Sequence, residues 1–180
     1  MQHYGLPTRL LDWTENPLAA LFFAVCKWKG KTTPAVWMME AGTLNKIVTG
    51  VDEIIVPGGS FSENWLPNKC HGEKAQLFVF KDEQYENAKP LAILPKHINR
   101  RITAQQSVFT VHGIEQHCIS SVFGEAEGNE GLLLQFEMNG CQRKQLLEEL
   151  ATLGISESSL FPELSTLAND LKRELGLDTE

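Results

Sequence analysis

Apolar residues follow a helical spacing in the segment after Asn16-Pro17. Asn is a good N-cap, and Pro at the first helical position removes no hydrogen bond that the helix needs. The apolar positions of this segment are Leu18, Leu21, Phe22 and Val25, and alanine and phenylalanine fill the other sides. Because a helix that is apolar nearly all round is buried on most sides, we predict a buried helix that ends near Trp28, before Gly30.

Two leucine-rich segments near the C-terminus predict two further amphipathic helices. The first carries Leu146, Leu147, Leu150 and Leu153 on one face and is followed by Gly154. The second carries Leu164, Leu167, Leu171 and Leu175 and is followed by Gly176. Gly is a common residue directly after a helix. We interpret the leucines of both helices as core residues.

Short apolar runs bounded by turn residues predict β-strands in the rest of the chain. We expect strands at Ala35–Glu40, Gln76–Phe80, Leu91–Leu94, Ser107–Val111, His117–Val122 and Leu132–Glu137. Their spacing favours a mostly antiparallel sheet. Residues 42–75 are less regular: Ile54–Val56 is a short apolar run, and the chain breaks at Pro57–Ser60. The stretch that follows, up to Glu73, is loop-like, and we predict either a functional loop or a plain surface excursion there. Since no repeat or linker divides the chain, the prediction is one α+β domain over residues 1–180.

Composition and charge restrict the class of function. Of the 180 residues, 42% are hydrophobic and 22% are charged, which is typical of a globular protein. The net charge of −7 disfavours nucleic acid as the main partner, because phosphate backbones bind basic surfaces. No apolar run approaches the roughly 18 residues of a membrane span, and no leader is visible. We therefore expect a cytoplasmic protein with no membrane partner.

The cysteines do not have the spacing of a metal site. Cys26, Cys70, Cys118 and Cys141 form no CxxC pair. Cys70-His71 and His117-Cys118 are adjacent pairs, but neighbours on a strand point to opposite faces, so each pair offers one ligand in one direction. We expect no metal and interpret the cysteines as reduced, buried thiols.

Polar and aromatic side chains are concentrated before the first predicted helix. They are His3, Tyr4, Thr8, Arg9, Asp12, Trp13 and Thr14. If this stretch is extended, Arg9 and Trp13 share a face and Asp12 lies on the other; a helical turn would instead pair Arg9 with Asp12. Arg9 is either such a structural partner or an anion donor with Trp13 or Tyr4 as a stacking surface. His3 is a candidate donor to a ribose hydroxyl, or a structural residue.

A second polar cluster runs from Arg100 to Gly113. Arg100 and Arg101 precede a predicted strand and form either a solvated edge or a ligand contact. Gln105 and Gln106 lie where a turn enters the strand, and an amide there can bind the polar edge of a ligand. The chain has no nucleophile elbow, and Pro57–Ser60 lacks the Lys of a phosphate-binding loop.

Several of these segments together resemble one family. Gln2–Thr14, followed by Asn16-Pro17 and Ala20–Ala24, is similar to the signature of the FRG domain family. Arg101, Gln105 and Phe109, and the run Leu160–Leu164, are similar to later landmarks of that family. The Phe-Arg-Gly segment that names the family lies upstream of this signature, and we expect that the given sequence lacks it. Ser107 stands where the family usually has Gly.

The resemblance has consequences for fold and function. A turn with Thr followed by such a helix is similar to the second motif of ADP-ribosyltransferases, in which a strand-end hydroxyl lies beside the nicotinamide of NAD and the helix packs a split sheet. On that analogy, Thr14 is the motif hydroxyl, and Gln105 or Gln106 takes the position of the catalytic Glu. The resemblance implies a bacterial ADP-ribosyltransferase or NAD glycohydrolase that acts as a toxin or phage-defence effector. The alternative is a non-catalytic module for a ligand or protein partner, or a truncated remnant of the domain.

Overall fold

The structure, a computed structural model, describes residues 8–57, 89–95, 99–113, 118–124, 132–139 and 142–177. These residues form two compact units. The first unit contains residues 8–13, 38–57, 89–95, 108–113, 118–124 and 132–134, and the second contains residues 14–37, 99–107, 135–139 and 142–177. Each unit is described by itself. The expectation of one domain over residues 1–180 stays a prediction.

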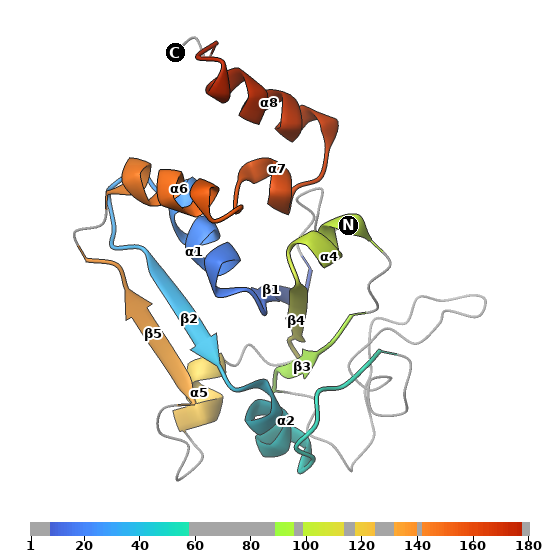
Figure 1. The fold of residues 1–180 in the computed structure, drawn as a ribbon. Coiled ribbons are helices and arrows are strands. Elements are labelled where there is room, and N and C mark those ends of the chain that lie inside the picture. The colour runs from blue at the N-terminus through green and yellow to red at the C-terminus, as the bar shows by residue number, and fades with distance from the viewer. Residues whose placement is uncertain are drawn as a thin grey trace. The chain divides into compact units, whose positions relative to one another are not determined.

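Helices and strands both occur along the described chain, which confirms the α+β prediction (Figure 1). The elements are β1 (Leu10–Thr14), α1 (Pro17–Cys26), β2 (Ala35–Met39), α2 (Ala41–Thr49), β3 (Leu91–Ile93), α4 (Arg100–Ala104), β4 (Ser107–Val111), α5 (Ile119–Gly124), β5 (Leu133–Glu137), α6 (Arg143–Thr152), α7 (Glu157–Leu160) and α8 (Leu164–Glu174).

The strands pair in two antiparallel sheets. One has the order β1-β4-β3 and the other pairs β2 with β5. In the first sheet, Ala92 of β3 lies opposite Thr110 of β4. His112 N–H donates to the Arg9 carbonyl at 2.8 Å beside β1 and β4. The prediction of mostly antiparallel pairing is confirmed for the described strands, and the strand predicted at Gln76–Phe80 lies outside the described residues.

In the first unit, helix α2 packs its buried face against α5 and hydrogen-bonds to the edge of β3. Leu44 of α2 packs with Ile119, Val122 and Phe123 of α5, and Leu44 is fully buried. The next residue, Asn45, is also fully buried. Its Nδ2 donates to the carbonyls of Glu53 at 2.7 Å and Ala92 at 2.9 Å, and its Oδ1 accepts from Ala92 N–H at 2.7 Å. One side chain thus bonds both backbone groups of Ala92, as a neighbouring strand would.

Helix α2 was not predicted; Glu40 caps it by accepting from Thr43 N–H, and Gly50 ends it in a left-handed conformation. The loop predicted up to Glu73 lies, from residue 58 onward, outside the described residues. One prediction in this unit is wrong. The strand predicted at His117–Val122 is the helix α5 instead. Its buried residues, Ile119, Val122 and Phe123, have the helical spacing i, i+3 and i+4. In so short an apolar run, this spacing is difficult to distinguish from the pattern of a buried strand.

The second unit has a helical core built on α1. Ala19 and Phe22 of α1 are buried with Leu150 of α6 and Leu160 of α7. Asn16 Oδ1 accepts from Leu18 and Ala19 N–H at 3.0 and 3.3 Å, which confirms the predicted N-cap. The helix ends at Cys26, two residues before the predicted Trp28. Its burial is one-sided, because Phe23 remains 40% exposed.

The leucines of α8 do not lie in a core. Helix α8 contacts α7 through polar groups: Asp170 accepts from Ser158 N–H at 2.9 Å, and Thr166 Oγ1 donates to the Phe161 carbonyl. The leucine face lies on another side of the helix, and Leu164 and Leu175 are 85% and 69% exposed. The core interpretation is therefore correct for Leu150, and it is wrong for Leu153, which is 63% exposed, and for the α8 leucines.

Candidate functional site

The end of β1 and the end of α4 are joined by one short hydrogen bond within the second unit. Thr14 Oγ1 donates to the Gln105 carbonyl at 2.6 Å, and the same oxygen accepts from Asn16 N–H at 3.0 Å. The hydroxyl thereby links the strand end, the cap of α1 and the C-cap of α4. Two positions 91 residues apart, both singled out in the sequence, are thus in contact.

The amide of Gln105 is also engaged within the protein. Its Nε2 donates to the Leu160 carbonyl at 3.0 Å, and its Oε1 accepts from Ser107 Oγ at 3.3 Å. Gln106 has a φ of 46°, a left-handed conformation that is uncommon outside glycine. Its carbonyl accepts from Glu15 N–H at 3.0 Å. The turn after α4 is therefore held at both glutamines, and the side chain of Gln106 is exposed.

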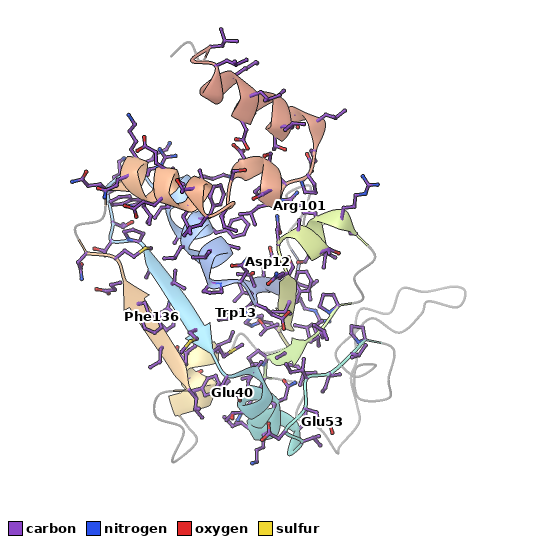
Figure 2. All side chains as sticks on the ribbon, in the orientation of Figure 1. Asp12, Trp13, Glu40, Glu53, Arg101 and Phe136 are labelled. Carbon is purple, nitrogen blue, oxygen red and sulfur yellow. The ribbon has the colours of Figure 1, made fainter. Side chains whose placement is uncertain are left out.

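Arg101 forms the charged part of this region (Figure 2). Its guanidinium carbon lies 4.3 Å from the centre of the Phe161 ring, and its Nη1 lies 4.0 Å from Glu163 Oε1. The Arg101 side chain is 25% exposed and that of Glu163 is 55% exposed. Arg101 Nε is buried and has no hydrogen-bond partner among the described residues. An aromatic face, a carboxylate and an incompletely paired guanidinium therefore meet beside Gln105.

The other predicted site residues that the structure describes lie in the first unit. Arg9 Nη1 donates to the His112 carbonyl at 3.2 Å, and burial lowers the pKa of Arg9. Trp13 Nε1 donates to Thr110 Oγ1 at 3.1 Å, and its ring packs against the core around Leu44. These contacts use Arg9 and Trp13 to join β1 to β4.

The alternatives left open for residues 9–14 are resolved in favour of an extended strand. Arg9 directly precedes β1, and Asp12 lies within it (Figure 2). Successive residues of a strand point to opposite faces, so Arg9 and Asp12, three positions apart, are not placed together as in a helical turn. Thr8 Oγ1 accepts from Leu10 N–H at 3.3 Å, which supports the start of the strand.

The predicted site residues are thus divided between the two units. Thr14, Gln105, Gln106 and Arg101 lie in the second unit, and Thr8, Arg9, Asp12 and Trp13 lie in the first. His3 and Tyr4 lie outside the described residues.

The candidate site also includes two residues that had no predicted role. Phe161 and Glu163 were noticed only as part of the run Leu160–Leu164, and they meet Arg101 through tertiary contact. The i, i+4 spacing of Arg101 and Gln105 indicates that these two residues share one side of a helical turn, and it does not indicate that Phe161 and Glu163 lie against that side.

In the parts of the chain that the structure describes, no three His, Cys, Asp or Glu side chains are grouped as a metal would need. Cys26 is half-buried, burial raises the pKa of its thiol, and both Cys26 and Cys118 are free. Cys118 is exposed, so the interpretation of buried thiols is wrong there. No helix among the described residues is long and apolar enough to cross a membrane.

Comparison with known proteins finds the same family that the N-terminal segment resembles. Residues 1–32 match the FRG domain family. This match confirms the resemblance for the segment that contains Thr8, Arg9, Asp12, Trp13 and Thr14. No curated protein and no solved structure matches the chain.

Proposed function

We propose that this chain handles NAD or a closely related nucleotide, with ADP-ribosyl transfer or NAD hydrolysis as its reaction. The observation that carries the proposal is the 2.6 Å hydrogen bond between Thr14 Oγ1 and the Gln105 carbonyl. It joins a residue of the FRG-matched segment to the position that the resemblance compares with a catalytic residue. A bacterial toxin or phage-defence effector is the biological role that we propose with it.

The chemistry requires a small number of groups. Cleavage of the bond between ribose and nicotinamide produces an oxocarbenium-like centre, and water or an acceptor nucleophile adds to that carbon and gives up a proton. Positioning of the dinucleotide and electrostatic stabilisation of the cationic centre supply most of the rate in such reactions. We assign catalysis to the region of Thr14, Gln105 and Gln106. For ligand binding we propose His3, Tyr4, Thr8, Arg9, Asp12, Trp13 and Arg101.

A second function is favoured by the same contacts. The Thr14 hydroxyl makes two internal hydrogen bonds, and both ends of the Gln105 amide are bonded within the protein. Groups that are already paired contribute binding surface and rigidity more readily than chemistry. The second candidate is therefore a non-catalytic module that binds a nucleotide or a protein partner.

Nicotinamide release separates the two candidates. Purified protein is incubated with NAD, and free nicotinamide is measured by chromatography for the wild type, Thr14→Ala and Thr152→Ala. Thr152 is a matched control, because it is an exposed threonine of α6 whose Oγ1 donates to the Glu148 carbonyl. The enzymatic proposal predicts release that falls at least tenfold in Thr14→Ala and is unchanged in Thr152→Ala. NAD binding without any release supports the second candidate and rejects the first.

The proposed biological role has its own test. Induced expression of the wild type in a bacterial host should arrest growth, and expression of Thr14→Ala at equal protein level should not. Normal growth with the wild type, under conditions where the protein releases nicotinamide in vitro, would reject the toxin role while leaving the reaction in place.

A further inference from the structure

We infer that Arg101 is the anchor for the phosphate part of the bound nucleotide and that Glu163 competes with the phosphate for its guanidinium. This inference rests on the proposed function and specifies how its ligand is held. It concerns three side chains of the second unit, Arg101, Phe161 and Glu163.

The guanidinium of Arg101 is only weakly paired. Charge-assisted N–H···O bonds are usually about 2.7–2.9 Å long. The Arg101 Nη1 to Glu163 Oε1 distance is 4.0 Å, so these groups attract each other without forming a short hydrogen bond. The buried Nε has no partner among the described residues. The guanidinium therefore keeps hydrogen-bonding capacity that the described residues do not use.

The position of the guanidinium is set by an aromatic stack. Arg101 lies over Phe161 at 4.3 Å, and Phe161 makes an edge-on contact with Phe23 of α1, with ring centres 5.9 Å apart. Phe23 in turn meets Phe22 edge-on at 5.9 Å, and Phe22 belongs to the buried core. The Arg101 plane is thereby supported from the core of the unit. Preorganised guanidinium groups bind phosphate through two parallel N–H···O bonds, which the two terminal nitrogens of Arg101 can supply because its Nε is buried.

The carboxylate of Glu163 can be displaced from Arg101. Its backbone is fixed, because its N–H donates to the Phe161 carbonyl at 2.7 Å and its carbonyl accepts from Thr166 Oγ1 at 2.8 Å. Its side chain, by contrast, is 55% exposed. The carboxylate therefore lies near Arg101 without being held there, and an oxyanion of higher charge can replace it.

Arg101 fits this role better than Arg9, the other arginine considered for it. Arg9 Nη1 already donates to the His112 carbonyl at 3.2 Å and helps to join β1 to β4. Arg101 lies in the same unit as Thr14 and Gln105. It is part of α4, and Gln105, four residues later, is the C-cap of that helix. The phosphate anchor and the Thr14–Gln105 contact thus belong to one compact unit.

Titration calorimetry with three probes tests the inference. The probes are inorganic pyrophosphate, ADP-ribose and, as a phosphate-free reference, adenosine. The proteins are the wild type, Arg101→Gln, Glu163→Gln and Glu148→Gln. Glu148 is the matched control, because it is 68% exposed and makes a comparably long ion pair, 3.9 Å, with Lys144 on α6.

Removal of the competing charge should tighten binding of the phosphate-containing probes. Exposed ion pairs are weak, so Glu163→Gln should lower the Kd for pyrophosphate and ADP-ribose by roughly two- to fivefold. Arg101→Gln should raise both Kd values at least tenfold, as expected for loss of a charge-assisted contact. Glu148→Gln should match the wild type, and no variant should change the affinity for adenosine. ADP-ribose that binds more tightly than pyrophosphate would identify a nucleotide, and the reverse order would identify a simple anion.

Several results would overturn the inference. They are an unchanged or raised Kd in Glu163→Gln, an unchanged Kd in Arg101→Gln, or no binding of either phosphate probe to any variant. If Arg101→Gln does not fold, Arg101→Lys keeps the charge and removes the two-pronged geometry, and it should still weaken binding. Since calorimetry measures binding only, an absence of nicotinamide release rejects the enzymatic proposal and leaves this inference standing.

Discussion

Asn45 is the residue whose replacement should most clearly test the account of the first unit. We consider Asn45→Leu, which keeps a side chain of similar size and removes all its polar groups. The wild-type side chain makes three hydrogen bonds of 2.7 to 2.9 Å, two with Ala92 and one with Glu53. Asn45 is fully buried and Ala92 is 4% exposed, so water cannot replace these bonds without an opening of the core.

The expected loss follows from these contacts. Three hydrogen bonds contribute about 1 kcal/mol each, and leaving the buried Ala92 N–H without a partner costs about 1–3 kcal/mol more. Burial of the leucine methyl groups returns about 1–2 kcal/mol. The free energy of unfolding should therefore fall by about 3 kcal/mol, which corresponds to a decrease in Tm of roughly 6–12 °C for a chain of this size.

Thermal and urea denaturation followed by circular dichroism measure this loss. Asn169→Leu is the control, because Asn169 is an exposed residue of α8, and its Tm should remain within roughly 1–2 °C of the wild type. If the free energy of unfolding of Asn45→Leu is within about 1 kcal/mol of that of the wild type, the edge of β3 does not depend on this side chain. The argument that α2 takes the place of a neighbouring strand then fails.

Three further changes test other parts of the structure. Leu150→Ala should lower the free energy of unfolding by about 2–5 kcal/mol in denaturant titrations, because Leu150 is 2% exposed. Leu164 is 85% exposed, so Leu164→Ala should change the free energy of unfolding by no more than about 0.5 kcal/mol. Equal losses in the two variants would contradict the exposed position of the α8 leucines. Arg143→Lys should lower the free energy of unfolding by about 1–2 kcal/mol in the same assay. The guanidinium Nε donates to the Val25 carbonyl at 3.0 Å and another nitrogen donates to the Cys26 carbonyl, and Lys cannot form both bonds in this geometry. No loss would show that these bonds at the end of α1 do not contribute to stability. Hydrogen bonding from Thr43 lowers the pKa of Glu40 in the folded state. The Glu40 carboxylate therefore stabilises the folded state above the unfolded-state pKa of about 4.3, and this stabilisation is lost as the pH falls through the lower folded-state pKa. Glu40→Gln should reduce the Tm at pH 7 and not at pH 3, and a Tm difference that does not depend on pH would contradict this.

Local signals in the sequence predicted much of the fold. Asn16-Pro17 predicted the start of α1 because capping is a property of adjacent residues. The runs at Ala35, Leu91, Ser107 and Leu132 predicted β2, β3, β4 and β5 to within one residue at each end. Helix α2 was overlooked although Leu44, Ile47 and Val48 have helical spacing and Gly50 follows them. The buried Asn45 lies within that stripe, and a polar residue at a core position conceals an amphipathic pattern.

The candidate site was less predictable, because its parts are far apart in the sequence. Arg101 and Gln105 were selected from one local cluster, but Phe161 and Glu163 reach Arg101 only through the packing of α7 beside α4. The engagement of the Gln105 amide with the Leu160 carbonyl likewise depends on tertiary structure. Sequence spacing indicates which residues share one helix face, and it contains no information on which distant turn packs against that face.

The most direct test of nucleotide handling is an NMR titration of isotope-labelled protein with NAD. We expect saturable shifts in the backbone amide signals of Thr14 and Gln105 and in the Nε–H signal of Arg101. In Glu163→Gln, the Arg101 Nε–H signal should shift at a lower NAD concentration than in the wild type. Signals that remain unmoved at millimolar NAD, or shifts confined to residues away from Thr14, Arg101 and Gln105, would contradict the proposal.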